Sequence, residues 1–265
     1  MPRADATAQV MIDLHTHVLP GVDDGPDTLK ESLELCRAAR EEGTRTLVAT
    51  PHVNGEYPNV TAAVVQEQVA LLNRALRAEN IDLTIRTGAE VALSRVGEMS
   101  DVELDLLTLG GGRYVLLELP WTSALSGAVA ALRAFAGRGY EIVLAHPERS
   151  PIAQRDVGLV RQLVESGVVC CLDAASLTPR ADRRTQTAAW ELLTEGLVHA
   201  IASDSHDAVR RPPKLVSVLH EAGLTAAQID YFASAAPQAI LNGQAVAPPP
   251  EVKDRRPRRR FRRPW

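Results

Sequence analysis

The chain has 265 residues, of which 45% are hydrophobic and 23% are charged, and its formal net charge is −4. This composition is typical of a globular protein and excludes a collagenous, mucin-like or wholly disordered chain. No apolar run reaches the ~18 residues that a membrane span requires, and residues 1–10 lack the apolar region of a secretory signal, so we expect a cytoplasmic protein.

Seven short apolar or β-branched runs alternate with segments of helical periodicity. We expect strands at 9–14, 45–50, 83–88, 114–119, 141–146, 168–173 and 198–203, and helices at about 29–43, 61–79, 124–137, 155–166, 184–196 and 211–221. This alternation predicts an α/β fold with a mainly parallel sheet, and seven such units favour a barrel over an open sheet.

Local signals support individual elements of this pattern. Thr28 and Glu31 have the spacing of a capping box at the start of the first helix, and Gly43 is a typical helix stop. Cys170 and Cys171 are neighbours in the sixth predicted strand, so their side chains point to opposite faces. We expect both of them, and Cys36, to be buried and reduced.

The chain is expected to have three regions: an N-terminal extension (1–10), a folded domain (11–242) and a disordered tail rich in proline and arginine (243–265). From Glu251 onward the tail carries Lys253 and seven arginines against two acidic residues, so the rest of the chain is acidic. An acidic body disfavours nucleic-acid binding by the folded domain, whereas the basic tail is suited to a weak contact with an anionic membrane surface.

Five of the seven histidines lie at or just after the end of a predicted strand: His15, His17, His52, His146 and His206. Three carboxylates occupy equivalent positions: Glu90, Glu118 and Asp204. In a barrel of parallel strands these ends converge on one face, where active sites are built. His199 begins its strand and His220 falls in a helix, so we expect both to lie outside the site.

The types and spacing of these residues indicate a metal centre. Residues i and i+2 of an extended chain point the same way, so His15 with His17, and Asp204 with His206, can each bind one ion. Imidazole and carboxylate donors without thiolate suit manganese, ferrous iron or zinc. A lone histidine at a strand end is usually structural. So many donors, however, exceed what one ion needs and predict a cluster of two or three ions able to act on a phosphate ester.

Two arginines follow histidines of this set at short distance. Arg149 comes three residues after His146, and Arg211 comes five residues after His206. A planar guanidinium binds phosphate through two parallel hydrogen bonds, so we expect both side chains at the mouth of the metal centre. Arg210 is expected to be the solvated neighbour.

Eight short motifs together resemble the polymerase and histidinol phosphatase (PHP) superfamily: DLHTH, GVDDGP, TPH, GAE, LLELP, AHPER, SDSH and RRPP. More closely, they are similar to the bacterial CpsB/YwqE-type protein-tyrosine phosphatases that accompany the kinases of capsule and exopolysaccharide synthesis. The resemblance covers about residues 11–242. It implies a distorted (β/α)7 barrel of the PHP type, hydrolysis of phosphotyrosine in proteins, and a cognate bacterial tyrosine kinase as the substrate.

The resemblance also implies three divalent ions, usually manganese, with iron or zinc as alternatives. In this pattern one ion is bound by His15, His17, Glu90 and Asp204. Glu90 bridges to a second ion that Glu118 and His146 complete, and the third is bound by Asp24, His52 and His206. The motif match alone selects Asp24 over its neighbour Asp23. Arg149 and Arg211 match the phosphate-binding arginines of the family, and the basic tail lies outside the pattern.

Other functions remain open from the residues alone. The first is a small-molecule phosphatase that uses the same metals, such as histidinol-phosphate phosphatase. The second is a PHP nuclease or phosphodiesterase, which the acidic body disfavours. The third is a non-catalytic docking module, which is disfavoured because every ligand position is filled. A thiol mechanism of the Cys-x5-Arg type is excluded because no cysteine has an arginine six positions later.

Overall fold

The computed structural model describes residues 10–121 and 125–254. Its strands are β1 (Met11–Thr16), β2 (Thr44–Ala49), β3 (His52–Val53), β4 (Thr84–Thr87), β5 (Glu90–Ala92), β6 (Tyr114–Glu118), β7 (Glu141–Ala145), β8 (Val169–Asp173) and β9 (Ala200–Ala202). Its α-helices are α1 (Leu29–Glu41), α2 (Ala62–Ala78), α3 (Asp101–Asp105), α4 (Leu125–Ala136), α5 (Pro151–Arg155), α6 (Val157–Glu165), α7 (Arg183–Thr194), α8 (Val216–Glu221), α9 (Ala226–Asp230) and α10 (Ala236–Leu241). Shorter helical segments are η1 (Val96–Glu98), η2 (Leu109–Gly111), η3 (Pro147–Arg149), η4 (Ala174–Leu177) and the π-helix η5 (Tyr231–Ala235).

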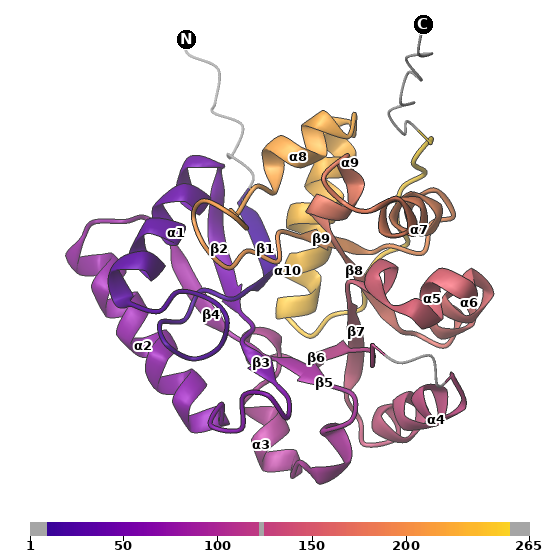
Figure 1. The fold of residues 1–265 in the computed structure, drawn as a ribbon, viewed down its shortest axis with the longest axis horizontal. Coiled ribbons are helices and arrows are strands. Elements are labelled where there is room, and N and C mark those ends of the chain that lie inside the picture. The colour runs from indigo at the N-terminus through magenta and orange to yellow at the C-terminus, as the bar shows by residue number, and fades with distance from the viewer. Residues whose placement is uncertain (1–9, 122–124, 255–265) are drawn as a thin grey trace, which may run out of the picture.

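The strands form two parallel sheets in the middle of the molecule, with most of the helices around them (Figure 1). One sheet has the order β1-β2-β4 and the other the order β3-β5-β6-β7-β8-β9. Each of the seven predicted runs contains a strand, so the expected parallel α/β arrangement is confirmed. The structure adds β3 and β5, which have only two and three residues and are too short to produce a recognisable alternation in the sequence.

Apolar side chains fill both faces of the sheets, which explains why the strands read as continuous apolar runs. In β8, Cys170 packs in one core cluster and Cys171 in the other, as their adjacent positions predict. The smaller cluster also contains Ile240 and Leu241 of α10, which therefore covers one face of the strands. All three cysteines are buried and unpaired. Within the described residues, no helix has the length and apolar character needed to cross a membrane.

The helix signals in the sequence are mostly confirmed. Thr28 and Glu31 form both hydrogen bonds of the capping box that begins α1. The helix predicted at 211–221 begins only at Val216, so its first five residues were wrongly assigned. Pro212 and Pro213 disfavour helical geometry in the residues before them, and this leaves Arg211 in a loop.

The C-terminal segment corrects the expectation of disorder from residue 243. Residues 243–254 run along the body, where the Tyr114 hydroxyl donates to the Gln244 carbonyl at 3.0 Å and the Gln228 amide donates to the Glu251 carbonyl at 2.7 Å. Val252 is 6% exposed within the main core. Side chains of the body supply the partners that an extended proline-rich segment cannot provide for itself. Residues 1–9 and 255–265, with most of the basic run, lie outside the described residues, so the predictions for them stay predictions.

Candidate metal centre

Most of the expected ligands lie at or just after the end of a strand, and at β1 the backbone is held by buried hydrogen bonds. Thr16 ends β1, and its hydroxyl donates to the Val48 carbonyl of β2 at 2.8 Å while its N–H donates to the Thr50 hydroxyl at 2.9 Å. These bonds fix the residues on either side, His15 and His17, which are both buried. The first pair of histidines thus projects from a rigid strand end.

The short strands β3 and β5 position two further expected ligands, His52 and Glu90. His52 begins β3 and Glu90 begins β5, and the two residues are direct partners in the parallel pairing of these strands. Nδ1 of His52 lies 3.0 Å from Oε2 of Glu90. Glu118 ends β6, the next strand of the same sheet. Three ligands therefore come from three adjacent strands.

Two further ligands have backbone conformations that non-glycine residues rarely adopt. His146 has φ 29° and Asp204 has φ 49°. Each follows a strand, β7 or β9, by one or two residues. Such conformations cost roughly 1–3 kcal/mol and persist only where the surrounding structure enforces them. Here they occur where the chain leaves β7 and where it leaves β9, and in both cases the side chain joins the centre.

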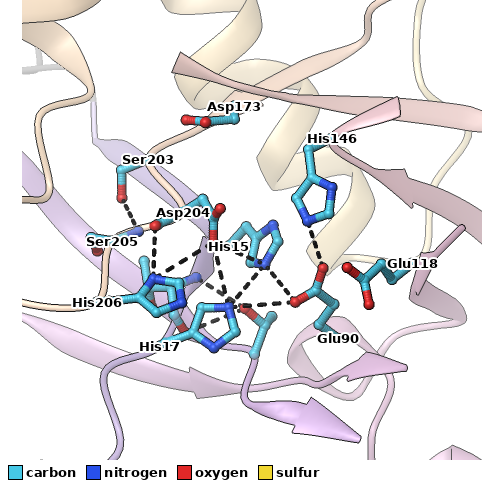
Figure 2. Close-up of polar contacts among 12 residues, drawn as sticks. His15, His17, Glu90, Glu118, His146, Asp173, Ser203, Asp204, Ser205 and His206 are labelled. Atoms are coloured by element: carbon cyan, nitrogen blue, oxygen red, sulfur yellow. Dashed lines mark hydrogen bonds and ion pairs between the residues drawn. The ribbon is translucent and has the colours of Figure 1, made fainter. Parts of the chain in front are cut away.

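The side chains form four overlapping groups whose potential ligand atoms lie within 4.8 Å of one another. The groups are His15, His17 and Asp204; His15, Glu90 and His146; His52, Glu90 and Glu118; and His17, Asp24, His52 and His206. Figure 2 shows His146 directed at Glu90, with Glu118 beside this carboxylate. Glu90 is the common member of two groups and contacts His15, His17, His52 and His146. All nine residues expected as ligands are therefore brought together.

Burial and opposite charges shift the pKa values of these groups in competing directions. Burial acts to raise the pKa of Glu90, but His15 and His146 outweigh it and hold the pKa well below its usual range. Burial acts to lower the pKa of His146, but Glu90 raises it to about 9. For His15 burial prevails, and its pKa is lowered. The centre thus concentrates ionised carboxylates among imidazoles.

Asp23 and Asp24, which the residues alone could not separate, have different positions. Oδ1 of Asp24 lies 3.2 Å from Nε2 of His206 and 3.5 Å from Nε2 of His52. Asp23 lies closer to His17, with Oδ2 2.6 Å from the Nδ1 atom that is 3.8 Å from Oδ1 of Asp24, and it accepts the N–H of His52 at 3.0 Å. Asp24 is thus in the ligand group and Asp23 supports it from behind.

The donors fit a cluster of divalent cations. Three buried atoms at the centre, Nδ1 of His52, Oε2 of Glu90 and Nε2 of His206, have no hydrogen bond of ordinary geometry within the described residues. Nε2 atoms of His15 and His17 face each other at 3.3 Å. Buried lone pairs that converge without partners are favourable only when a cation lies among them. The set contains imidazoles and carboxylates and no thiolate, which suits manganese, iron or zinc.

Arg149 and Arg211 reach the same carboxylate from two sides. Nη1 of Arg149 donates to Oδ2 of Asp204 at 2.7 Å, and Nη2 of Arg211 donates to the same oxygen at 2.8 Å. Arg149 also pairs with Asp173. Both arginines line a cavity of about 570 Å³ together with Asp24, His52, Glu90, Glu118, His146 and Asp204. The two cations therefore lie at the opening beside the ligands.

The residues expected to lie outside the site do so. His199 is buried, but its Nδ1 atom accepts the backbone N–H of Cys170, near the start of β8, at 3.3 Å. Burial lowers the pKa of His199. His220 is exposed on α8, and Arg210 is exposed and 3.7 Å from Asp207.

Sequence reasoning missed several residues that support the ligands. Trp121 donates its indole N–H to Oε1 of Glu118 at 3.0 Å, although it is 59% exposed. Glu148 accepts the backbone N–H of Asp173 at 3.0 Å and so holds the backbone of the residue that pairs with Arg149. Trp121 directly follows the LLELP motif and Glu148 lies within AHPER, and this proximity was the available signal.

The fold and the donor set define the class of protein as an α/β protein with parallel sheets and a cluster of candidate metal ligands at one end of the strands. Residues 11–227 match a family model for capsular polysaccharide synthesis proteins, CpsB/CapC. The chain belongs to this CpsB/CapC family, and the resemblance drawn from its motifs is confirmed.

Named relatives and a solved structure agree with this assignment. The tyrosine-protein phosphatase YwqE of Bacillus subtilis (strain 168) is 32% identical over 253 residues, which cover 93% of this chain and 98% of YwqE. The tyrosine-protein phosphatase CpsB of Streptococcus pneumoniae is 27% identical over 210 residues, 77% of this chain and 86% of CpsB. The crystal structures of YwqE from Bacillus subtilis and CpsB from Streptococcus pneumoniae are described as those of unique metal-dependent tyrosine phosphatases. One of them superposes on this chain with a TM-score of 0.76 at 30% sequence identity, and the match covers 92% of this chain and 100% of the other.

Proposed function

We propose that this protein is a metal-dependent phosphatase that hydrolyses phosphotyrosine in proteins, and that its substrate is a bacterial tyrosine kinase of polysaccharide export. The observation that carries the proposal is the convergence of Arg149 and Arg211 on Asp204, at the edge of a dense group of metal-binding side chains. Two guanidinium groups beside a multivalent cation site suit a phosphate ester dianion. The relatives YwqE and CpsB, named as tyrosine phosphatases, support phosphotyrosine as the ester.

The proposed cluster holds three ions, which we take to be manganese. His15, His17, Glu90 and Asp204 would hold the first, Glu90, Glu118 and His146 the second, and Asp24, His52 and His206 the third. The spatial groups support this division in part. Asp24, His52 and His206 lie in one group, and His15, His17 and Asp204 lie in another, whereas Glu118 and His146 belong to separate groups that share Glu90. When bound, such ions lower the pKa of a coordinated water and neutralise charge on the phosphate.

The side chains of the protein bind and orient the phosphate. Arg149 and Arg211 would donate hydrogen bonds to oxygens of the phosphate and balance the charge that develops during transfer. Asp173 and Asp204 hold the Arg149 guanidinium in place before the substrate arrives. No protein nucleophile is needed. Burial raises the pKa of the Cys36 and Cys170 thiols to about 12, which supports a mechanism without a thiolate.

We further propose that the two sheets together make the distorted seven-unit barrel of the family. Thr16 of β1 bridges to Ser205 after β9, next to the bond from the His17 N–H to the Ser205 carbonyl at 2.8 Å. At the other junction only Gly88 and Ala89 separate β4 from β5. Both junctions support a closed ring of strands with the ligands at its carboxyl end. We place the protein in the cytoplasm, where its kinase substrate would be phosphorylated.

The test is turnover of four phosphate esters by the full chain loaded with manganese. The four are a phosphotyrosine peptide, a phosphoserine peptide, histidinol phosphate and single-stranded DNA. We expect the phosphotyrosine peptide to be hydrolysed with the highest kcat/KM. We also expect a chelator to abolish activity, manganese to restore it, and thiol alkylation of the folded protein to leave it unchanged. Preference for histidinol phosphate or DNA, or full activity after the metal is stripped, would contradict the proposal.

A further inference from the structure

A second cavity lies next to the metal centre and shares a wall with it. Arg149, Asp204 and Arg211 line both cavities. The second one has a volume of about 380 Å³, and the rest of its wall comes from the end of β8 and the segment after it, from the segment between β9 and α8, and from α8 itself. A molecule bound at the two arginines can therefore extend into this second cavity.

Three exposed cations lie on the rest of the wall of the second cavity, and two of them have no acidic partner within the described residues. Arg180 and Lys214 are exposed, and within the described residues neither side chain forms an ion pair. Arg210 is 89% exposed and forms a long ion pair with Asp207, at 3.7 Å. These three cations belong to two separate loops, so their approach to one cavity is a result of the tertiary structure.

The acidic residues on the same wall are mostly engaged elsewhere. Asp173 and Asp204 pair with Arg149, and Asp204 also pairs with Arg211. Glu221 of α8 remains, but no ion pair joins it to a cation of this wall in the part of the chain that the structure describes. The cavity thus has a modest surplus of positive charge, which suits a ligand group with a single negative charge.

We propose that this cavity is a specificity subsite that binds a carboxylate side chain of the substrate protein, an aspartate or glutamate near the phosphotyrosine. The inference rests on the proposed phosphotyrosine phosphatase function. An extended chain advances ~3.3 Å per residue, so an acidic residue within about three positions stays within roughly 10 Å of the phosphotyrosine. That residue reaches the cavity that adjoins the phosphate site, where Arg180 and Lys214 attract its charge.

The experiment compares two phosphotyrosine peptides that differ only in flanking residues, acidic in one and alanine in the other, with p-nitrophenyl phosphate as a substrate too small to reach the subsite. We expect the wild-type protein to prefer the acidic peptide. The double variant Arg180→Ala/Lys214→Ala should lower kcat/KM for that peptide by roughly tenfold, mainly through KM, since each exposed ion pair contributes up to about fivefold. Its kinetics on the alanine peptide and on p-nitrophenyl phosphate should not change.

Arg74→Ala provides the matched control, because Arg74 is an exposed arginine of α2 and lines neither cavity. It should behave as wild type on all three substrates. The preference for the acidic peptide should also shrink as salt rises, because screening weakens exposed charges.

Equal turnover of both peptides by the wild-type protein would overturn the subsite and leave the phosphatase function intact. An equal loss on all three substrates in the double variant would also overturn it, because the preference for the acidic peptide would then persist without the two cations. No turnover of either peptide would reject the proposed function and the subsite with it.

Discussion

Asp23 lies directly behind His17, with its Oδ2 atom 2.6 Å from Nδ1 of the imidazole. Burial acts to raise the pKa of Asp23, but His17 outweighs it and lowers the pKa, so this carboxylate stays ionised. The contact fixes the orientation of His17 and leaves its Nε2 atom facing Glu90 and Asp204. A carboxylate in this position raises the basicity of a ligating imidazole.

Asp23→Asn should therefore weaken metal binding although Asp23 is not itself a proposed ligand. The amide cannot provide the same charge to His17, and loss of such a partner typically costs 10–100-fold in metal affinity. Titration of the metal-free protein with manganese measures this affinity. Asp27→Asn, at an exposed position of the same loop, should bind manganese as wild type does. Unchanged affinity in Asp23→Asn would show that His17 needs no such support.

Glu90→Gln should remove at least one equivalent of metal and most of the activity, because Glu90 contacts four of the histidines and is proposed to bridge two ions. His199→Ala should keep all of the metal and lose only some stability, since it removes a buried hydrogen bond to Cys170. Elemental analysis of both purified variants gives the metal content. If His199→Ala lost its metal while Glu90→Gln retained it, the assignment of ligands to strand ends would be wrong.

Arg211→Ala should lower kcat/KM by roughly 10²-fold or more with metal content unchanged, on the scale of losing one preorganised charged donor. Arg149→Ala should have an effect of the same size. Its loss also frees Asp173 and Asp204, which are buried, so thermal unfolding must be followed in parallel. Arg210→Ala provides the control on p-nitrophenyl phosphate and should match the wild-type protein. Near-normal kinetics in both Arg149→Ala and Arg211→Ala would exclude them from phosphate binding.

Truncation after Asn242 should destabilise the fold, whereas truncation after Asp254 should not. The shorter form loses the buried side chain of Val252 and the hydrogen bond from Tyr114 to Gln244. Together these contribute about 2 kcal/mol or more to the free energy of unfolding. Denaturant unfolding of the two truncated forms and the full chain gives the comparison. Equal stability of all three would mean that residues 243–254 contribute nothing to the core.

The sequence by itself determined the alternation of strands and helices and most of the set of candidate metal ligands. Apolar runs and capping signals are local, so the strand at 141–145 and the capping box at Thr28 were readable without the fold. The candidate ligands other than Asp24 were readable for the same reason: a histidine or carboxylate after an apolar run marks a strand end, and parallel strands bring their ends together.

Tertiary structure decided the details that depend on contacts between distant segments. Asp24 rather than Asp23 joins the ligands because the loop folds tightly over β1, where a Cβ on Gly25 would lie 2.3 Å from the His17 carbonyl oxygen. The packing of residues 243–254 and the meeting of Arg180 with Lys214 in the second cavity depend on the tertiary fold in the same way. Loops and proline-rich segments carry no periodic pattern, so their course is set by the surfaces against which they pack.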